Sequence, residues 1–170
     1  MDNKNNINTK FENNENTYLD SFNKILETKN GIVNELLELI RNTNNHVVRE
    51  KTILFLIDNF KDDKILPCLL ELIKRPDLQN YNAFIVFACG EYSDCKENIE
   101  FFFELVLNYD FHVAWNAAEI IIKMRPPFEK QTISNFLNIL IQEKPKIIGP
   151  KIDFFENLIE FFEYYISYDE

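Results

Sequence analysis

The sequence predicts an all-α protein, namely an α-solenoid of antiparallel helix pairs with about four repeats and a C-terminal capping helix. The segment Leu36–Ile40 (LLELI) returns as Leu69–Ile73 (LLELI), as Phe102–Val106 (FFELV) and, more weakly, as Phe136–Leu140 (FLNIL). The spacings of 33, 33 and 34 residues lie in the range of stacked helical repeats. Apolar residues recur at helical spacing from Thr17 onward, and the connections are short, so successive helices should be antiparallel neighbours.

Residues 1–16 are polar and rich in Asn and Lys, so we expect a disordered lead-in followed by a single domain over 17–170. Helices are predicted at residues 17–28, 31–42, 46–60, 63–74, 79–91, 97–108, 111–125, 128–143 and 151–167. Turn and cap residues separate them at Asn30-Gly31, Asn42–Asn45, Lys61–Asp63, Arg75–Asp77, Ser93-Asp94 and Arg125–Pro127. The helix at 17–28 is either a cap or the first member of a repeat.

In each predicted pair the second helix carries the LLELI-type segment. The first helices carry Val48–Ile57, Gln79–Ala88 and Val113–Ile122. Small or modest side chains, such as Ala83 and Ala117, let neighbouring helix axes approach to about 8–10 Å. A single pair cannot bury its apolar stripe, whereas stacked pairs share one continuous core.

The first helices also carry a family resemblance. Val48-Arg49 followed by Thr52, and Val113 followed by Ala117-Ala118, resemble the first-helix pattern of HEAT-type repeats. The similarity covers roughly residues 31–143 and implies a fold rather than a role. The signatures of tetratricopeptide and ankyrin repeats are missing from the sequence.

The net charge of −10 limits the partners that the chain can bind. An acidic surface repels phosphate backbones, so no nucleic-acid binding is expected, and it attracts basic proteins. Solubility alone is the other explanation of this charge. Uncharged runs such as Ala83–Cys89 are shorter than a membrane helix requires, and no basic leader precedes an apolar stretch, so a cytoplasmic location without membrane contact is expected.

The sequence offers no catalytic constellation, and we predict a protein that is not an enzyme and has no cofactor or metal. The three Gly are isolated, so no phosphate-binding loop is present. Cys68, Cys89 and Cys95 are expected as reduced, buried thiols, with a Cys89–Cys95 bridge as the alternative. HEAT-type di-iron hydroxylases use repeated His-Glu dipeptides, which this sequence lacks, and HEAT-type DNA glycosylases have a basic groove of the opposite charge.

Two acidic surfaces are candidates for binding a partner. Glu38, Glu71 and Glu104 recur with the repeat and could form a ladder of carboxylates along the concave face, or could simply be the solvated sides of amphipathic helices. The third repeat combines carboxylates with aromatic residues, which is a common composition of protein-binding surfaces. The predicted partner-binding residues are Glu71, Glu91, Tyr92, Asp94, Glu97, Glu100, Glu104, Tyr109 and Trp115. Trp115, the only Trp, could equally belong to the core.

The last helix carries a third candidate surface. Asp153, Glu156, Glu160 and Glu163 recur at three- and four-residue spacing and form one charged stripe. We expect this helix to cap the core and show its charged side to water. Its tyrosines, including Tyr164, Tyr165 and Tyr168, could also meet a partner.

The segment Phe84–Ile122 is similar to small bacterial HEAT-type proteins encoded beside polymorphic toxins. That resemblance implies an immunity protein that binds a basic toxin domain, such as a nuclease, and blocks its active site. The Asn-, Lys- and Ile-rich composition is typical of a low-GC bacterial source. The alternative is a HEAT-repeat scaffold or adaptor for a cellular protein partner.

Overall fold

The computed structural model describes residues 27–62, 64–92 and 95–168, and these residues form helices and no strand. The expected disordered segment and most of the helix expected at 17–28 lie outside them. A helix covers residues 27–42. It is followed by α2 (His46–Asn59), α3 (Ile65–Ile73), η1 (Pro76–Tyr81), α4 (Asn82–Cys89), η2 (Cys95–Asn98), α5 (Ile99–Asn108), α6 (Phe111–Lys123), α7 (Lys130–Glu143), η3 (Lys144–Lys146) and α8 (Lys151–Tyr168).

The prediction of an all-helical protein is confirmed, but one predicted break is wrong. Residues 27–42 form one uninterrupted helix across Asn30-Gly31, where a turn was expected. A helical Gly costs about 1 kcal/mol relative to Ala. Burial of Val33, Leu37 and Ile40 in the core outweighs this cost. In the described part of the chain, no helix has the length and apolar character needed to cross a membrane.

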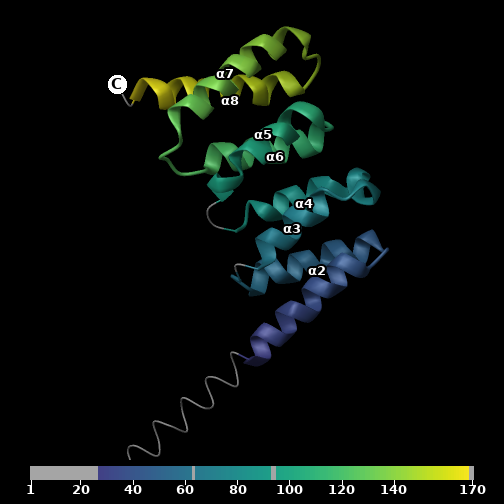
Figure 1. Ribbon diagram of the computed structural model, residues 1–170. Helices are drawn as coiled ribbons and strands as arrows, with labels where there is room; N and C mark the ends of the chain where they lie inside the picture. Colours follow the sequence, from purple (N-terminus) through teal and green to yellow (C-terminus); the bar gives the residue numbers. More distant parts are fainter. Residues whose placement is uncertain (1–26, 63, 93–94, 169–170) are drawn as a thin grey trace, which may run out of the picture.

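The helices are stacked from residues 27–42 at one end of the molecule to α7 and α8 at the other (Figure 1). Contacts between alternate helices divide them into two rows. In the first row, here called the even row, α2 contacts α4, α4 contacts α6 and α6 contacts α8. The second row, called the odd row, contains the helix at 27–42, α3, α5 and α7. Arg41 bonds Glu71 of α3, and the ring of Phe103 in α5 stacks on that of Phe136 in α7 with centroids 4.0 Å apart.

The closest pairs are offset by one helix from the predicted pairs. The most extensive contacts along the chain join α3 to α4, α5 to α6 and α7 to α8, whereas the sequence suggested α2 with α3 and α4 with α5. Small residues explain the tight approach of α6 to its neighbours. Ala114, Ala117 and Ala118 are fully buried in α6. A Cβ added to Gly90, at the end of α4, would meet Ile120 of α6 at 3.1 Å.

Buried polar side chains of the even row bond the ends of odd-row helices. Arg49 donates from Nε to the Ile40 carbonyl at 2.9 Å and also bonds the Thr43 carbonyl. Asn82, one period later, donates from Nδ2 to the Ile73 carbonyl at 2.8 Å. The last carbonyls of a helix have no partner within it, so these side chains satisfy groups that burial would otherwise leave unpaired.

We predict that Asn82→Ala lowers the free energy of unfolding by about 1–3 kcal/mol, because the buried Ile73 carbonyl loses its donor. Asn59→Ala is the matched control, since Asn59 Nδ2 donates to the Phe55 carbonyl at a similar 2.9 Å but in solvent. Its expected cost is below about 0.5 kcal/mol. Urea denaturation followed by circular dichroism measures both, and equal losses would contradict the assigned role.

Candidate functional site

The starts of α5 and α7 enclose an acidic hollow. It has a cavity volume of about 220 Å³. Three carboxylates belong to it, from Glu97 in η2, Glu100 in α5 and Glu129 at the N-cap position of α7. The complete lining is Glu97, Ile99, Glu100, Pro127, Phe128, Glu129, Thr132 and Ile133.

The wall formed by residues 127–129 is held in place by α8. The Tyr165 hydroxyl accepts a hydrogen bond from the Phe128 backbone N–H at 2.7 Å and lies 2.9 Å from the Phe128 carbonyl, to which it donates. The two rings also meet edge to face, with centroids 5.2 Å apart. The last helix therefore positions an aromatic ring beside the three carboxylates.

The carboxylates of Glu97 and Glu100 have no ion pair within the described residues. Glu129 accepts a hydrogen bond from the Thr132 hydroxyl at 2.9 Å. Helix N-termini carry partial positive charge, so the starts of α5 and α7 stabilise these anions. The hollow thus presents concentrated negative charge beside an apolar wall, which suits a cationic side chain with an aliphatic stem.

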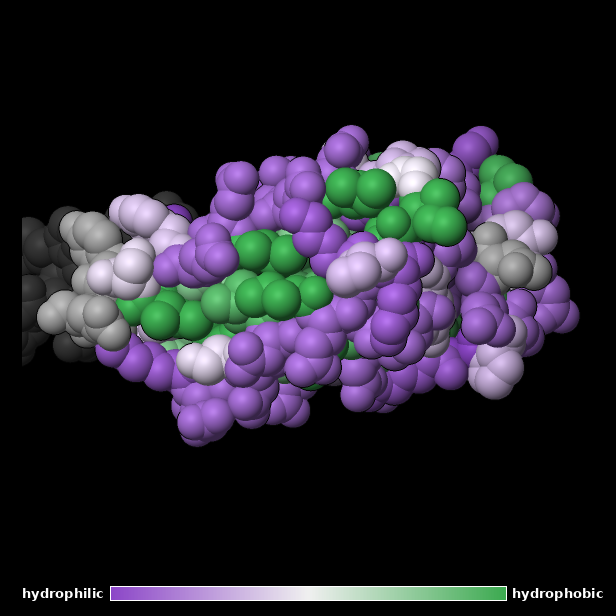
Figure 2. Space-filling view, turned by 90° about the horizontal axis from the view of Figure 1, so that it is seen from above, coloured by the Kyte–Doolittle hydropathy of each residue, from purple (hydrophilic) through white to green (hydrophobic). Residues whose placement is uncertain are grey.

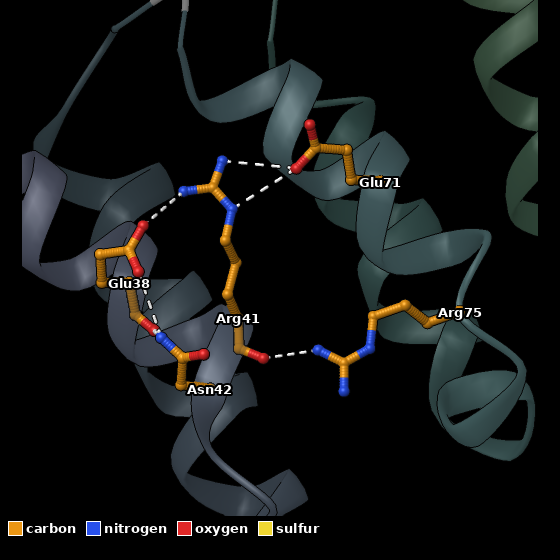
Figure 3. A network of polar contacts seen from close by, with 5 residues as sticks. All are labelled: Glu38, Arg41, Asn42, Glu71 and Arg75. Atoms are coloured by element: carbon orange, nitrogen blue, oxygen red, sulfur yellow. Dashed lines mark hydrogen bonds and ion pairs between the residues drawn. The ribbon is translucent and has the colours of Figure 1, made fainter.

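The predicted ladder of Glu38, Glu71 and Glu104 is not a row of equivalent charges (Figure 3). Arg41 lies between the first two, 3.1 Å from Glu38 and 3.4 Å from Glu71. Lys74, one period after Arg41, lies instead over the ring of Phe101, 5.0 Å from its centroid. Glu104 is exposed and has no ion pair in the part of the chain that the structure describes.

The structure places Trp115 away from the acidic hollow. Trp115 is 39% exposed and contacts Phe154 of α8, with ring centroids 6.1 Å apart, so it belongs to the even row. The hollow is built by α5 and α7 of the odd row. Tyr109 is half-buried, and its carbonyl accepts from Lys151 Nζ at 2.5 Å. Glu91 is exposed, and its carbonyl accepts from Lys61 Nζ.

The prediction that Tyr92 is a surface contact is wrong. Its side chain is 7% exposed and packs in the core, and its hydroxyl has no hydrogen-bond partner among the described residues. Burial raises the pKa of Tyr92 to about 12. The sequence could not show this, because the turn after α4 folds the ring inward. Asp94 lies outside the described residues.

The described residues contain no group of three or more His, Cys, Asp or Glu side chains placed to hold a metal ion. Cys68, Cys89 and Cys95 are buried, and no disulfide bond joins any two of them. Burial raises the pKa of Cys68 to about 11, so this thiol is a poor nucleophile at neutral pH.

Six of the eight residues that line the hollow were not predicted from the sequence, among them Phe128 and Glu129. Glu129 and Phe128 lie about thirty residues from Glu97 along the chain, and only the packing of α7 beside α5 brings them together. The available signal was the period itself, since residues near 97 and 129 both precede an odd-row helix. Comparison of the chain with protein-family models, with curated proteins and with solved structures finds no match.

We predict that Tyr92→Phe raises the free energy of unfolding at pH 7 by about 1 kcal/mol, because it removes a buried hydroxyl that lacks a partner. Tyr in an unfolded chain has a pKa of about 10. The folded state therefore holds this proton more tightly, and the corresponding stability is lost as the pH rises from about 10 to about 12.

The advantage of Tyr92→Phe over the unchanged protein should accordingly widen above pH 10. Thermal denaturation at pH 7, 9, 10 and 11 measures it, and the exposed Tyr164→Phe serves as the control. A destabilised Tyr92→Phe variant at pH 7 would show that the hydroxyl is bonded in solution.

Proposed function

We propose that this chain is a HEAT-like α-solenoid without catalytic activity that binds a basic protein, and that its partner is a bacterial toxin domain which it neutralises in the cytoplasm. One observation carries the proposal. The hollow between α5 and α7 gathers Glu97, Glu100 and Glu129, and the first two have no ion pair among the described residues. These carboxylates are available to a cationic partner.

The shape of the hollow supports recognition of a Lys or Arg side chain. The Phe128 wall would contact the aliphatic stem, and the carboxylates would accept hydrogen bonds from the charged end. Glu104, on the exposed side of α5, extends the acidic surface. Long-range attraction from a chain of net charge −10 would speed the encounter.

Inhibition of a toxin by this surface needs no chemistry. A toxin that acts on nucleic acid binds phosphates with basic residues. Carboxylates that occupy those residues would block the substrate. The similarity of Phe84–Ile122 to HEAT-type immunity proteins supports this role, because the segment includes α5 and the first carboxylates of the hollow.

A scaffold or adaptor for a cellular protein is the second candidate function, and the same acidic hollow would serve it. The two candidates differ in the identity of the partner. An immunity protein is encoded next to its toxin, so a toxin-like gene directly upstream favours the first candidate, and a housekeeping operon favours the second.

Co-expression tests the immunity role directly. The upstream toxin domain is expressed alone and together with this chain, and survival of the cells is counted. We expect survival only when the chain is present. Death in both cultures would show that the chain is not the antidote of that toxin.

We predict that the double variant Glu97→Lys/Glu100→Lys binds the purified toxin domain at least tenfold more weakly, because repulsion replaces attraction at the hollow. Glu27→Lys/Glu35→Lys is the control, since it changes the net charge equally on exposed positions at the other end of the molecule. Titration calorimetry measures the dissociation constants, and circular dichroism checks helicity. Equal weakening by both variants would leave only a general charge effect and refute the hollow as the site.

A further inference from the structure

The last helix pair carries an apolar groove whose lining residues are only partly buried by the described residues. On α8, Ile152, Ile159 and Ile166 are spaced by seven residues, so they form one stripe, and all three are only half-buried. On α7, the half-buried Leu137 and the 49% exposed Ile141 form a second stripe.

Contacts on the other sides of α8 show where its isoleucine stripe faces. Phe154 of α8 packs on Trp115 of α6, and Phe162 packs on Phe136 of α7, with ring centroids 6.1 and 6.0 Å apart. Around the axis of α8, Phe162 lies between Phe154 and the isoleucine stripe, so the stripe is on the side turned away from α6. It therefore borders α7 at the end of the molecule. Figure 2 looks onto this end and shows an apolar strip between two hydrophilic borders.

One border of the groove is acidic. Viewed along the axis of α8, Glu156 and Glu163 lie beside the isoleucine stripe on the side away from Phe162. Glu160 and Asp153 lie next to these two residues. Glu156 pairs with Lys144 at 2.9 Å, while Asp153, Glu160 and Glu163 have no ion pair within the described ranges. No Lys or Arg occurs after Lys151 in the sequence.

We propose that this groove, defined by Leu137, Ile141, Ile152, Ile159 and Ile166, is a docking site for a basic amphipathic helix of another protein. The apolar face of such a helix would fill the groove, and its Lys or Arg residues would meet the acidic border. Charge decides between the possible occupants. A second copy of this chain would oppose carboxylates with carboxylates on a protein of net charge −10.

The groove is long enough for this mode of recognition. The isoleucine stripe spans 15 residues of helix, and the 14 steps between its ends correspond to about 21 Å at 1.5 Å per residue. A docked helix of about 14 residues matches that length and offers anchors at positions i, i+3 or i+4, i+7 and i+11. The site is separate from the hollow between α5 and α7 and does not depend on the proposed toxin binding.

The test uses the full-length protein and three fluorescein-labelled 16-residue peptides. The first has Leu on one helical face and Lys elsewhere, the second has Glu in place of each Lys, and the third has the composition of the first with Leu spread around the helix. Fluorescence anisotropy should show binding of the first peptide only.

Two groove variants locate the binding. Ile159→Ser should raise the dissociation constant of the first peptide at least tenfold. Glu160→Gln/Glu163→Gln changes only exposed residues, so it keeps the fold, and should raise the constant about fivefold at low salt. Glu27→Gln/Glu35→Gln removes the same charge from exposed positions at the other end of the molecule and should leave binding unchanged.

Three outcomes would overturn the proposal. The first is equal binding of the Glu peptide or of the peptide with spread leucines. The second is equal weakening by Glu27→Gln/Glu35→Gln, which would show a general charge effect. The third is a dimer in analytical ultracentrifugation that Ile159→Ser dissociates, which would identify a second copy as the occupant. None of these results bears on toxin neutralisation, so the two proposals fail independently.

Discussion

The fold depends on the fact that one helix pair cannot bury its own apolar residues. Each pair has apolar side chains on two sides, and the neighbouring pairs cover them, so the core runs continuously from Val33 to Phe162. The same constraint leaves an apolar side at the end of the array. The groove between α7 and α8 is therefore a direct consequence of the way the core is built. Its acidic border disfavours association of this apolar strip with a second copy of the chain, so the strip stays exposed to water.

Stacking also requires that buried helix ends find partners. Arg49 and Asn82, one period apart, bond carbonyls at the ends of the two preceding odd-row helices. One period further along the chain stands Trp115, whose ring lies toward Phe154 of α8. Lys151 instead reaches the Tyr109 carbonyl from α8. The last pair is thus tied to the array by a different link, and Trp115 remains partly exposed.

Much of the fold could be predicted because the period and the apolar spacing are local properties of the sequence. The helix boundaries agree to within a few residues where cap residues are clear, as at Asn45 and Asp110, whose side chains bond the first N–H groups of α2 and α6. The predicted break at Asn30-Gly31 is wrong because burial of the apolar side chains of this helix outweighs the local preference for a turn. The pairing of the helices depends on which alanine-lined helix faces pack together, and the sequence alone does not determine this.

The candidate site was harder to predict because it depends on which side of a helix faces a neighbour. Glu97 and Glu100 were found from composition, whereas Glu129 and Phe128 join them only through the packing of α7 on α5. Tyr92 looked like Tyr109 in the sequence, yet the turn after α4 buries it. Aromatic residues near a turn can point either way, and one sequence does not distinguish the two.

Some carboxylates of the chain are paired with an arginine, and others have no cation beside them within the described residues. Between the helix at 27–42 and α3, Arg41 joins Glu38 and Glu71, and Arg75 bonds the Arg41 carbonyl. Lys74 contributes a cation–π contact at the next junction. Around α5 no such cation reaches Glu100 or Glu104 within the described residues. Like charges on one helix face destabilise it by a few tenths of a kcal/mol for each pair. The chain therefore carries a small stability cost at α5 that it avoids at α3, and binding of a cationic partner would remove that repulsion.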